Sequence, residues 1–494
     1  MPKRLIEVEG AFPLEEVSAE SRREKNIRHG HISTLHIWWA RRPLAASRTT
    51  IFAALMPAPD NADNQARRRS ATNSKLRNLR VTALRDLIAH IAPWEAVKDG
   101  DNRCIQQARA LIRQIYPEPP KVLDCFAGGG SIPLEALRLG CATYALDYNP
   151  VAVLILKAIL EYPQKFGRIL LDAVKQWGDW VLNEAKKELD KFYPKDPDGS
   201  IPVGYLWART LPCQDPNCGA EIPLMRQTWL AKKDNRAIAL KLTADKTAKR
   251  VDATIVQGNQ IDFDPSVGTV KGAVVTCPVC GGTIDDDTTR RLFREGKSGQ
   301  RMMAVVLHHP QRSGKTYRLP TSRDLQAYRA AEAALETKRQ QLWAEWGIDP
   351  VPDELIPTPC HEVDRLPMYG MPRWGDAFNA RQKLALITFA DAVRRAHKEM
   401  LAQGAEPEFA KAVVTYLALT FNRLAASYNS LCRWQPAGEK IADVFSRQAL
   451  PMVWDFSEPN PFGGASRSWD ELFRDTNDVL THLTRIPPVK EAEL

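Results

Sequence analysis

The chain has 494 residues, of which 44% are hydrophobic and 26% charged, and its formal net charge is +9. These values are ordinary for a globular protein and argue against a disordered or fibrous chain, while the moderate positive charge permits a nucleic-acid partner without requiring one. No stretch approaches the roughly 18 apolar residues of a membrane helix, and the N-terminal residues lack the apolar core of a signal peptide. We therefore expect a cytoplasmic protein without a membrane partner.

Sequence patterns divide the chain into five predicted regions. Residues 1–115 are expected to be helical and contain the motif HIWWARRP. Residues 116–200 read as a strand, a turn, a helix and a second strand, followed by a further helix. Short β-strands are expected in residues 201–320, long helices in residues 321–432, and an irregular tail rich in Trp, Pro and Gly in residues 433–494. The predicted fold class is α/β.

The segment 121-KVLDCFAGGGSIPLEALRLGCATYALDYNP-150 has the pattern of a nucleotide-binding half-unit. The turn FAGGGS lets backbone approach a ligand because glycine has no Cβ. The second strand ends at Asp147, 19 residues after Gly128, where a carboxylate can accept hydrogen bonds from two ribose hydroxyls. The dinucleotide pattern GxGxxG fails, because Pro133 stands where its third glycine would be.

Asp124, at the start of the turn, narrows the choice of ligand. Its carboxylate would repel a phosphate but attract an ammonium group. S-adenosylmethionine has an α-ammonium, a ribose and an adenine but no phosphate, so it fits better than a phosphorylated nucleotide. Two alternatives stay open, namely NAD or another nucleotide, and a glycine turn that binds nothing.

Four of the nine cysteines form two close pairs, 213-CQDPNC-218 and 277-CPVCGG-282. This spacing is typical of a zinc ribbon, in which two turns each present two thiolates to one Zn²⁺. We predict a structural zinc ion bound by Cys213, Cys218, Cys277 and Cys280; the alternative is four unrelated surface cysteines. The other five are expected to be small buried hydrophobic residues: Cys104, Cys125, Cys141, Cys360 and Cys432.

A basic segment, 226-RQTWLAKKDNRAIALKLTADKTAKR-250, lies between the two cysteine pairs. Lysines and arginines on a rigid ribbon would be suited to follow a phosphate backbone. A solvated basic face without a ligand explains the same residues equally well.

Several motifs resemble DNA methyltransferases. FAGGGS followed by ALDYNP is similar to the first two motifs of the amino-group DNA methyltransferases, although Cys125 stands where proline is usual. HGHISTLHIWWARRPLA, GDAFNARQKLALITFADAV and RQALPMVWDFSEPNPFGG resemble the adenine-specific DNA methylases that contain a zinc-ribbon module, and this resemblance extends over nearly the whole chain. It implies a Rossmann-like, S-adenosylmethionine-dependent core with a zinc-ribbon β insertion and added helical regions.

The resemblance also implies which residues bind the cofactor. Those lining its methionine end would be Asp124, Phe126, Ala127, Gly128 and Gly130. Asp147 would hold the ribose, with Asn149 beside it. The WWARRP segment would close over the methionine moiety through Trp39 and Arg41, with Trp38 and Arg42 as further candidates. The alternative for this segment is a buried aromatic pair beside a basic surface.

One motif that adenine methylation requires is missing. These enzymes hold the amine with a loop [DN]-P-P-[YFW], whose aromatic ring stacks on the extruded base, and the nearest match here is 460-NPF-462. We therefore expect the cofactor-binding half of a split or truncated DNA adenine methyltransferase, whose catalytic loop comes from a second polypeptide. The resemblance implies a role in restriction or phage defence. The alternatives are a non-catalytic zinc-ribbon DNA-binding or scaffold subunit, and an RNA or protein methyltransferase.

Overall fold

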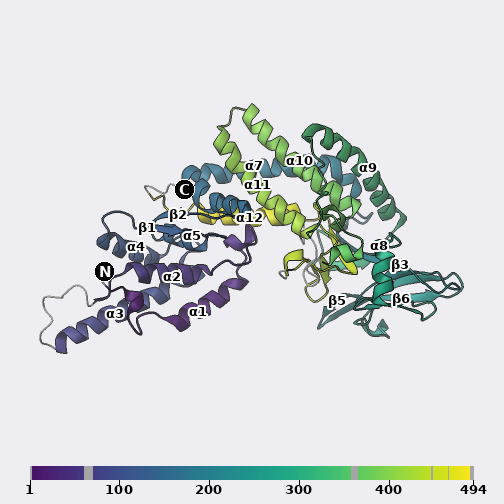
Figure 1. Ribbon diagram of the computed structural model, residues 1–494, viewed down its shortest axis with the longest axis horizontal. Coiled ribbons are helices and arrows are strands. Elements are labelled where there is room, and N and C mark those ends of the chain that lie inside the picture. The colour runs from purple at the N-terminus through teal and green to yellow at the C-terminus, as the bar shows by residue number, and fades with distance from the viewer. Residues whose placement is uncertain (1–2, 60–70, 358–364, 447–448, 465–466, 490–494) are drawn as a thin grey trace. The chain divides into compact units, whose positions relative to one another are not determined.

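The computed structural model (Figure 1) describes residues 3–59, 71–357, 365–446, 449–464 and 467–489. This part of the chain is a mixed α/β protein with many helices and several separate sheets. None of its helices combines the length and the apolar character needed to cross a bilayer. The chain forms two compact units: the first contains Met1–Gly178, His397–Leu419 and Arg474–Leu494, and the second contains Asp179–Ala396 and Thr420–Phe473.

The first unit is helical apart from one small parallel sheet. Strands β1 (Lys121–Asp124) and β2 (Ala142–Ala145) pair so that Leu123 lies beside Tyr144. Helix α5 (Ser131–Arg138) connects the strands and packs on both, and α2 (Leu44–Leu55) packs against α5. The other helices that begin in this unit are α1 (Leu14–Arg23), α3 (Ala71–Ile91), α4 (Arg103–Ile115), α6 (Pro150–Leu156), α7 (Tyr162–Leu189) and α11 (Pro407–Ser427).

The turn between β1 and α5 requires its glycines. Gly128 and Gly130 have φ angles of +51° and +73°, in the left-handed region that side chains with a Cβ disfavour. A Cβ at Gly130 would also collide with Ile159, which belongs to a short π-helical stretch (Lys157–Glu161) between α6 and α7. The turn can therefore lie directly against this helix only because residue 130 has no side chain.

The small sheet is uncovered on one side. Among the described residues, β1 pairs only with β2. Leu123 is 60% exposed, and two aromatic residues just beyond the strand ends, Phe126 and Tyr148, are 85% and 97% exposed. Parallel strands are normally buried on both faces of their sheet, so within the described residues this sheet is incomplete.

The second unit is built around a five-stranded antiparallel sheet with the order β12–β11–β3–β15, in which β4 pairs with the far end of β3. Its strands are β3 (Ile201–Pro212), β4 (Glu221–Leu224), β11 (Gly299–His308), β12 (Lys315–Arg318) and β15 (Asp455–Pro459). A second sheet contains β5 (Trp229–Lys233), β6 (Arg236–Asp245) and β7 (Arg250–Gln257). The remaining strands are β8 (Val270–Lys271), β9 (Val274–Thr276), β10 (Thr283–Ile284), β13 (Arg433–Gln435) and β14 (Lys440–Ala442).

Helices α8 (Asp286–Arg294), α9 (Ser322–Trp346) and α10 (Ala380–Ala402) begin in the second unit. A buried ion pair links α10 to β15: Arg381 Nε lies 2.6 Å from Glu458 Oε1, and both side chains are fully buried. The Trp207 indole also donates to Glu458, at 2.8 Å. Because β15 lies beside β3, this carboxylate joins residues more than 200 positions apart in the chain.

Residues 433–494 differ from the predicted irregular tail. They contain β13, β14, β15 and helix α12 (Trp469–Leu483). The buried residues of α12 recur at helical spacing, and they include Trp469, Leu472, Phe473, Leu480 and Leu483. The helical pattern of α12 was missed because this region is rich in Trp, Pro and Gly. Strand β15 forms by pairing with β3, which is far away in the sequence, so local sequence does not indicate it.

Candidate cofactor pocket and metal centre

The glycine turn of the first unit lines a cavity of about 300 Å³, at the small end of the range for ligand sites. Two acidic residues, Asp124 and Asp147, and two basic residues, Arg41 and Arg42, line this cavity. The other lining residues are Trp38, Ala40, Phe126, Ala127, Gly128, Gly129, Ser131 and Ile132. The cavity therefore offers groups of both charges to a bound molecule.

The backbone of the turn holds both carboxylates in place. Asp147 Oδ2 accepts a hydrogen bond from the Gly128 N–H and its Oδ1 accepts one from the Asn149 N–H, each at 2.8 Å. Asp124 Oδ1 accepts one from the Phe126 N–H at 3.2 Å. Each carboxylate oxygen can accept a second bond, so Asp147 can bind ligand hydroxyls without losing its support.

Ser131 is a pocket residue that sequence analysis missed. Ser131 lines the cavity at the N-terminus of α5 and is only 3% exposed. Within the described residues, its hydroxyl has no hydrogen-bond partner. An unsatisfied buried hydroxyl costs about 1–3 kcal/mol, and a ligand in the cavity would remove that cost. Ser131 could have been identified from its position in the sequence, because it directly follows three glycines at the start of a predicted helix.

Residues 35–43, the tryptophan loop, lie against the glycine turn. A Cβ on Gly128 would collide with the Trp38 indole nitrogen, and one on Gly129 would lie 3.3 Å from the Arg41 side chain. Burial lowers the pKa of Arg41, although an arginine remains a cation at neutral pH. In the described part of the chain, no hydrogen bond or ion pair engages its guanidinium. Arg41 is therefore available to a carboxylate bound in the cavity.

The predicted cofactor residues do not all reach the cavity. Those that line it are Asp124, Phe126, Ala127, Gly128, Asp147 and Arg41, whereas Gly130, Asn149 and Trp39 do not. Gly130 begins α5, and the Asn149 side chain accepts the Val151 N–H at the start of α6. Trp39 is 50% exposed, and its neighbour Trp38 takes the position against the turn.

Glu24 caps α2, the helix that follows the tryptophan loop. Its Oε1 accepts the Leu44 N–H at 2.9 Å and its Oε2 accepts the Ala45 N–H at 3.0 Å. His31 Nε2 lies 2.9 Å from the same Oε1. Burial raises the pKa of Glu24, but the His31 hydrogen bond and the two amides outweigh burial and lower the pKa below its ordinary value. The capping group is therefore a carboxylate at neutral pH.

The stabilisation that Glu24 provides is expected to disappear in acid. Because the folded-state pKa is below the unfolded value of about 4.3, the contribution is complete above that pH and is lost as pH falls through the folded pKa. The difference in Tm between wild type and Glu24→Gln should therefore be large near pH 7 and shrink below about pH 4. A difference that stays constant over this range in thermal denaturation would contradict the assignment.

A buried ionic network fixes α2 to α5. Arg48 Nη1, on α2, lies 2.7 Å from Glu135 Oε2, on α5, and neither side chain is more than 1% exposed. Arg138, also on α5, donates to Asp101 at 3.1 Å and lies 2.8 Å from His482 Nε2. The segment that carries the tryptophan loop is thereby joined to the helix that begins at the glycine turn.

Glu135→Ala is expected to reduce the free energy of unfolding by about 3–5 kcal/mol, because Arg48 would remain buried without its counter-ion. Urea denaturation measures this change. Glu20→Ala is the matched control, since it removes an exposed ion pair with Arg23 and should cost less than about 1 kcal/mol. Equal effects of the two variants would show that the buried pair does not join the helices as described.

Four cysteines of the second unit lie close enough to bind one metal ion, with all their sulfurs within 4.8 Å of one another. Cys213 and Cys218 lie between β3 and β4, and Cys277 and Cys280 between β9 and β10. The Cys213–Cys280 and Cys218–Cys277 sulfurs are 3.5 and 3.8 Å apart. A tetrahedral ion with Zn–S bonds of about 2.3 Å would space its sulfurs by about 3.8 Å. The prediction that the two pairs meet is confirmed.

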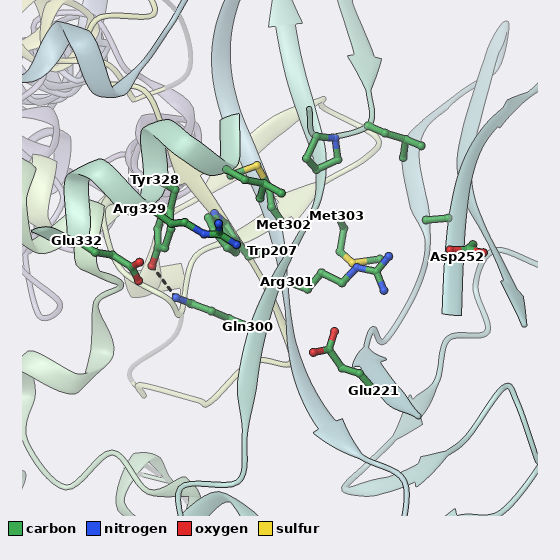
Figure 2. A pocket seen from close by; sticks show the side chains of 14 residues that line it. Trp207, Glu221, Asp252, Gln300, Arg301, Met302, Met303, Tyr328, Arg329 and Glu332 are labelled. Carbon is green, nitrogen blue, oxygen red and sulfur yellow. Dashed lines mark hydrogen bonds between the residues drawn. The ribbon is translucent and has the colours of Figure 1, made fainter. Parts of the chain in front are cut away.

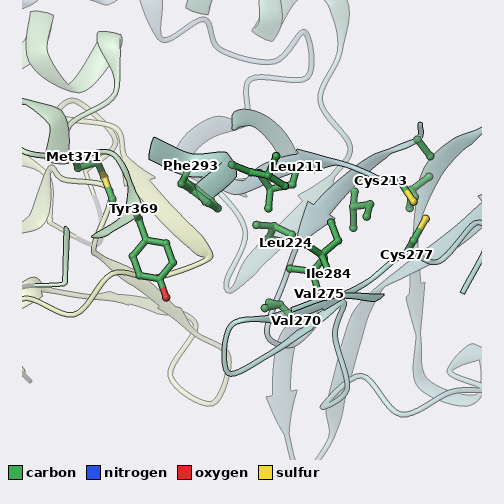
Figure 3. Packing of buried hydrophobic residues seen from close by; sticks show 14 of the residues in the cluster. Leu211, Cys213, Leu224, Val270, Val275, Cys277, Ile284, Phe293, Tyr369 and Met371 are labelled. Atoms are coloured by element: carbon green, nitrogen blue, oxygen red, sulfur yellow. The ribbon is translucent and has the colours of Figure 1, made fainter. Parts of the chain in front are cut away.

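The surroundings of the cysteine cluster shift the pKa values of its thiols in opposite directions. Burial raises the pKa of the Cys213 thiol to about 12, whereas the Gly282 N–H, which donates to Cys280 Sγ at 3.3 Å, lowers the pKa of Cys280. A metal ion would favour the thiolate form of all four residues. Figure 3 shows Cys213 and Cys277 at one end of an apolar cluster that includes Leu211 and Ile284, so an ion bound by the cysteines would also support the packing of this core.

The other five cysteines behave differently from one another. Cys141 and Cys432 are buried as predicted, and Cys104 is half-buried. Cys125 is exposed, which contradicts the prediction, because it lies in the turn beside the uncovered sheet rather than in the core. Cys360 lies outside the described residues.

The basic segment between the cysteine pairs forms β5, β6 and most of the turn that leads to β7. Several of its cations pair with acids: Lys241 contacts Asp262 at 2.7 Å, and Lys233 and Arg236 both pair with Glu439. This pairing reduces the positive charge available to a phosphate backbone, and it favours the solvated-face interpretation for these residues.

A larger cavity of about 700 Å³ lies in the second unit, between β11 and α9 (Figure 2). Its lining includes Trp207, Arg301, Met303 and Glu332, and the Gln300 amide donates to the Tyr328 hydroxyl at 2.6 Å. None of the predicted site residues lies there. Its mixture of apolar groups and charges of both signs does not select a class of ligand.

The geometry thus defines an α/β protein with a small pocket at a glycine turn and a four-cysteine cluster that can hold a metal ion. Residues 11–79 match a family described as a protein of unknown function, DUF1156, and this match includes the tryptophan loop. No curated protein and no solved structure matches the chain.

Proposed function

We propose that this protein is the cofactor-binding component of an S-adenosylmethionine-dependent DNA adenine methyltransferase. The observation that carries the proposal is the combination of charges at the glycine turn, where two acidic and two basic residues line one cavity. The α-amino acid end of S-adenosylmethionine is a zwitterion. Asp124 would bind its ammonium group, Arg41 its carboxylate and Asp147 the ribose hydroxyls. When bound, the cofactor supplies a methyl group on a sulfonium centre.

The unpartnered Ser131 hydroxyl and the parallel β1–α5–β2 unit support the same proposal. In open α/β sheets, ligands bind at the carboxyl ends of the strands, which is where Asp124 and Asp147 lie. We infer a Rossmann-like methyltransferase core from this arrangement. A phosphorylated nucleotide such as NAD is the less favoured ligand, because its phosphates would face these carboxylates.

The uncovered sheet favours the proposal that a second polypeptide binds this chain. Leu123 in β1, Phe126 just after it and Tyr148 after β2 are exposed, and the 494 residues contain no [DN]-P-P-[YFW] loop. A partner that adds parallel strands to β1 would cover these side chains and bring an amine-binding loop to the pocket. The role in restriction or phage defence rests on the motif resemblance alone.

We propose Zn²⁺ as the ion of the four-cysteine cluster. Four thiolates at tetrahedral spacing suit zinc, and with four protein ligands the ion has no open position for water. Its role would be structural, holding together the turns after β3 and β9.

Isothermal titration of S-adenosylmethionine into the purified chain tests the proposed function. We expect binding at one site, and no methyl transfer to DNA until a partner that carries the amine-binding loop is added. Competition between DNA and RNA substrates in that complex then identifies the acceptor. A chain that binds DNA but not S-adenosylmethionine would favour the scaffold alternative, and one that binds NAD instead would reject the assignment.

A further inference from the structure

The tryptophan loop is closed at its base by one buried carboxylate. Glu24 lies outside the loop and is 8% exposed. It binds His31, just before the loop, and the first amides of α2, just after it, with all three distances between 2.9 and 3.0 Å. A single side chain thus joins the two ends of the segment that carries Trp38 and Arg41.

The start of α2 depends on this carboxylate. Its N-cap residue is Pro43, whose side chain makes no capping hydrogen bond. The free N–H groups of a helix N-terminus need acceptors and favour negative charge. Glu24 provides hydrogen-bond acceptors for the Leu44 and Ala45 N–H groups and also a negative charge. The start of α2 is therefore fixed by a residue that lies outside the helix and the loop.

His31 is itself held rigidly. Its Nδ1 lies 3.2 Å from the Ser33 backbone nitrogen and 2.8 Å from the Ser33 hydroxyl, and its Nε2 lies 2.9 Å from Glu24 Oε1. The ring is 1% exposed and lies 5.3 Å from the Trp94 ring. The Thr34 hydroxyl also donates to the His31 carbonyl at 2.7 Å. Both nitrogens of the imidazole are therefore engaged by neighbouring groups.

We propose that Glu24 and His31 are positioning residues, which hold the tryptophan loop so that Arg41 meets the amino-acid end of the bound cofactor. This inference rests on the proposed function. Arg41 sits against Gly129 and Trp38 against Gly128, and within the loop the Arg41 N–H donates to the Trp38 carbonyl at 3.4 Å. Because Glu24 joins the two ends of the loop, it restricts the loop's orientation, and a preorganised loop costs less to order when the ligand binds.

Binding of two ligands distinguishes a loss of loop positioning from a general loss of stability. S-adenosylhomocysteine has the amino-acid end that Arg41 would contact, and 5′-methylthioadenosine has the nucleoside without it. The dissociation constants of both are measured by isothermal titration for wild type, His31→Ala, Glu24→Gln and Arg41→Ala. His29→Ala is the matched control, because His29 is exposed and contacts Asp478 instead of Glu24.

We expect His31→Ala and Glu24→Gln to weaken S-adenosylhomocysteine binding by about tenfold or more and to leave 5′-methylthioadenosine binding nearly unchanged. Combining His31→Ala with Arg41→Ala should add little to Arg41→Ala alone, since coupled residues are not additive. Glu24→Gln keeps the shape of the side chain, so it serves if His31→Ala fails to fold.

Equal losses for both ligands, or no loss for either, would overturn the positioning role while leaving the proposed function intact. Full additivity of His31→Ala and Arg41→Ala would also overturn it, because the two residues would then act independently. If the wild type binds neither ligand, the proposed function fails, and the positioning role fails with it.

Discussion

Replacing Asp147 with alanine is expected to weaken S-adenosylmethionine binding by about 100-fold or more. The carboxylate would accept two ribose hydroxyls, and a hydrogen bond to a charged group contributes about 1.5–3 kcal/mol, where 1.4 kcal/mol is a tenfold change in affinity. Isothermal titration measures the loss. Asp147→Asn keeps the size of the side chain but not its charge, and it should give an intermediate loss.

The control for Asp147→Ala is Asp172→Ala, which changes an exposed aspartate on α7. Asp147 also accepts the Gly128 and Asn149 amides, so the Tm of each variant shows whether the turn has been disturbed. An Asp147→Ala protein that folds and binds S-adenosylmethionine with wild-type affinity would place the cofactor elsewhere, and the pocket at the glycine turn would lose its proposed role.

Cys277→Ser is expected to remove the bound metal and to destabilise the second unit strongly. Structural zinc contributes apparent free energies of about 10–16 kcal/mol in small zinc-binding peptides, which is comparable to the whole stability of a typical domain. Cys277 is buried at the end of the apolar cluster (Figure 3), so loss of the ion also exposes that core. Zinc content by mass spectrometry and Tm by calorimetry report the two effects.

Cys104→Ser is the matched control for the metal centre, because Cys104 is half-buried and lies outside the cluster. It should retain one equivalent of zinc and a Tm near the wild-type value. A Cys277→Ser protein that keeps its metal and its Tm would show that the four sulfurs meet without forming a binding site.

Local sequence was sufficient to predict the strands, the turn and the helix around FAGGGS, because glycines and apolar periodicity are short-range signals. The two cysteine pairs could also be predicted to meet, since their spacing is that of a zinc ribbon, in which both pairs lie around one ion. The residues that line the pocket were harder to predict. Trp38 and Trp39 are adjacent in the sequence, and only the path of the loop decides that Trp38 lies against Gly128.

Long-range pairing accounts for most of what could not be predicted. Strand β15 exists because β3 lies beside it, and Glu458 is buried because Arg381 meets it there. Glu24 is charged and would be expected at the surface, but it is buried where it can cap α2. None of these partners is near in sequence, and a single sequence contains no signal that joins them.

The exposed edge of β1 is expected to affect how this chain behaves during expression, both in the cell and in the laboratory. Unpaired strand edges with apolar side chains promote self-association, and Leu123 and Phe126 lie at such an edge. If a partner covers this edge, as the proposed function implies, chains made in excess of that partner would be expected to aggregate or be degraded. Balanced synthesis with the proposed partner, and co-expression in the laboratory, would then keep this chain dispersed.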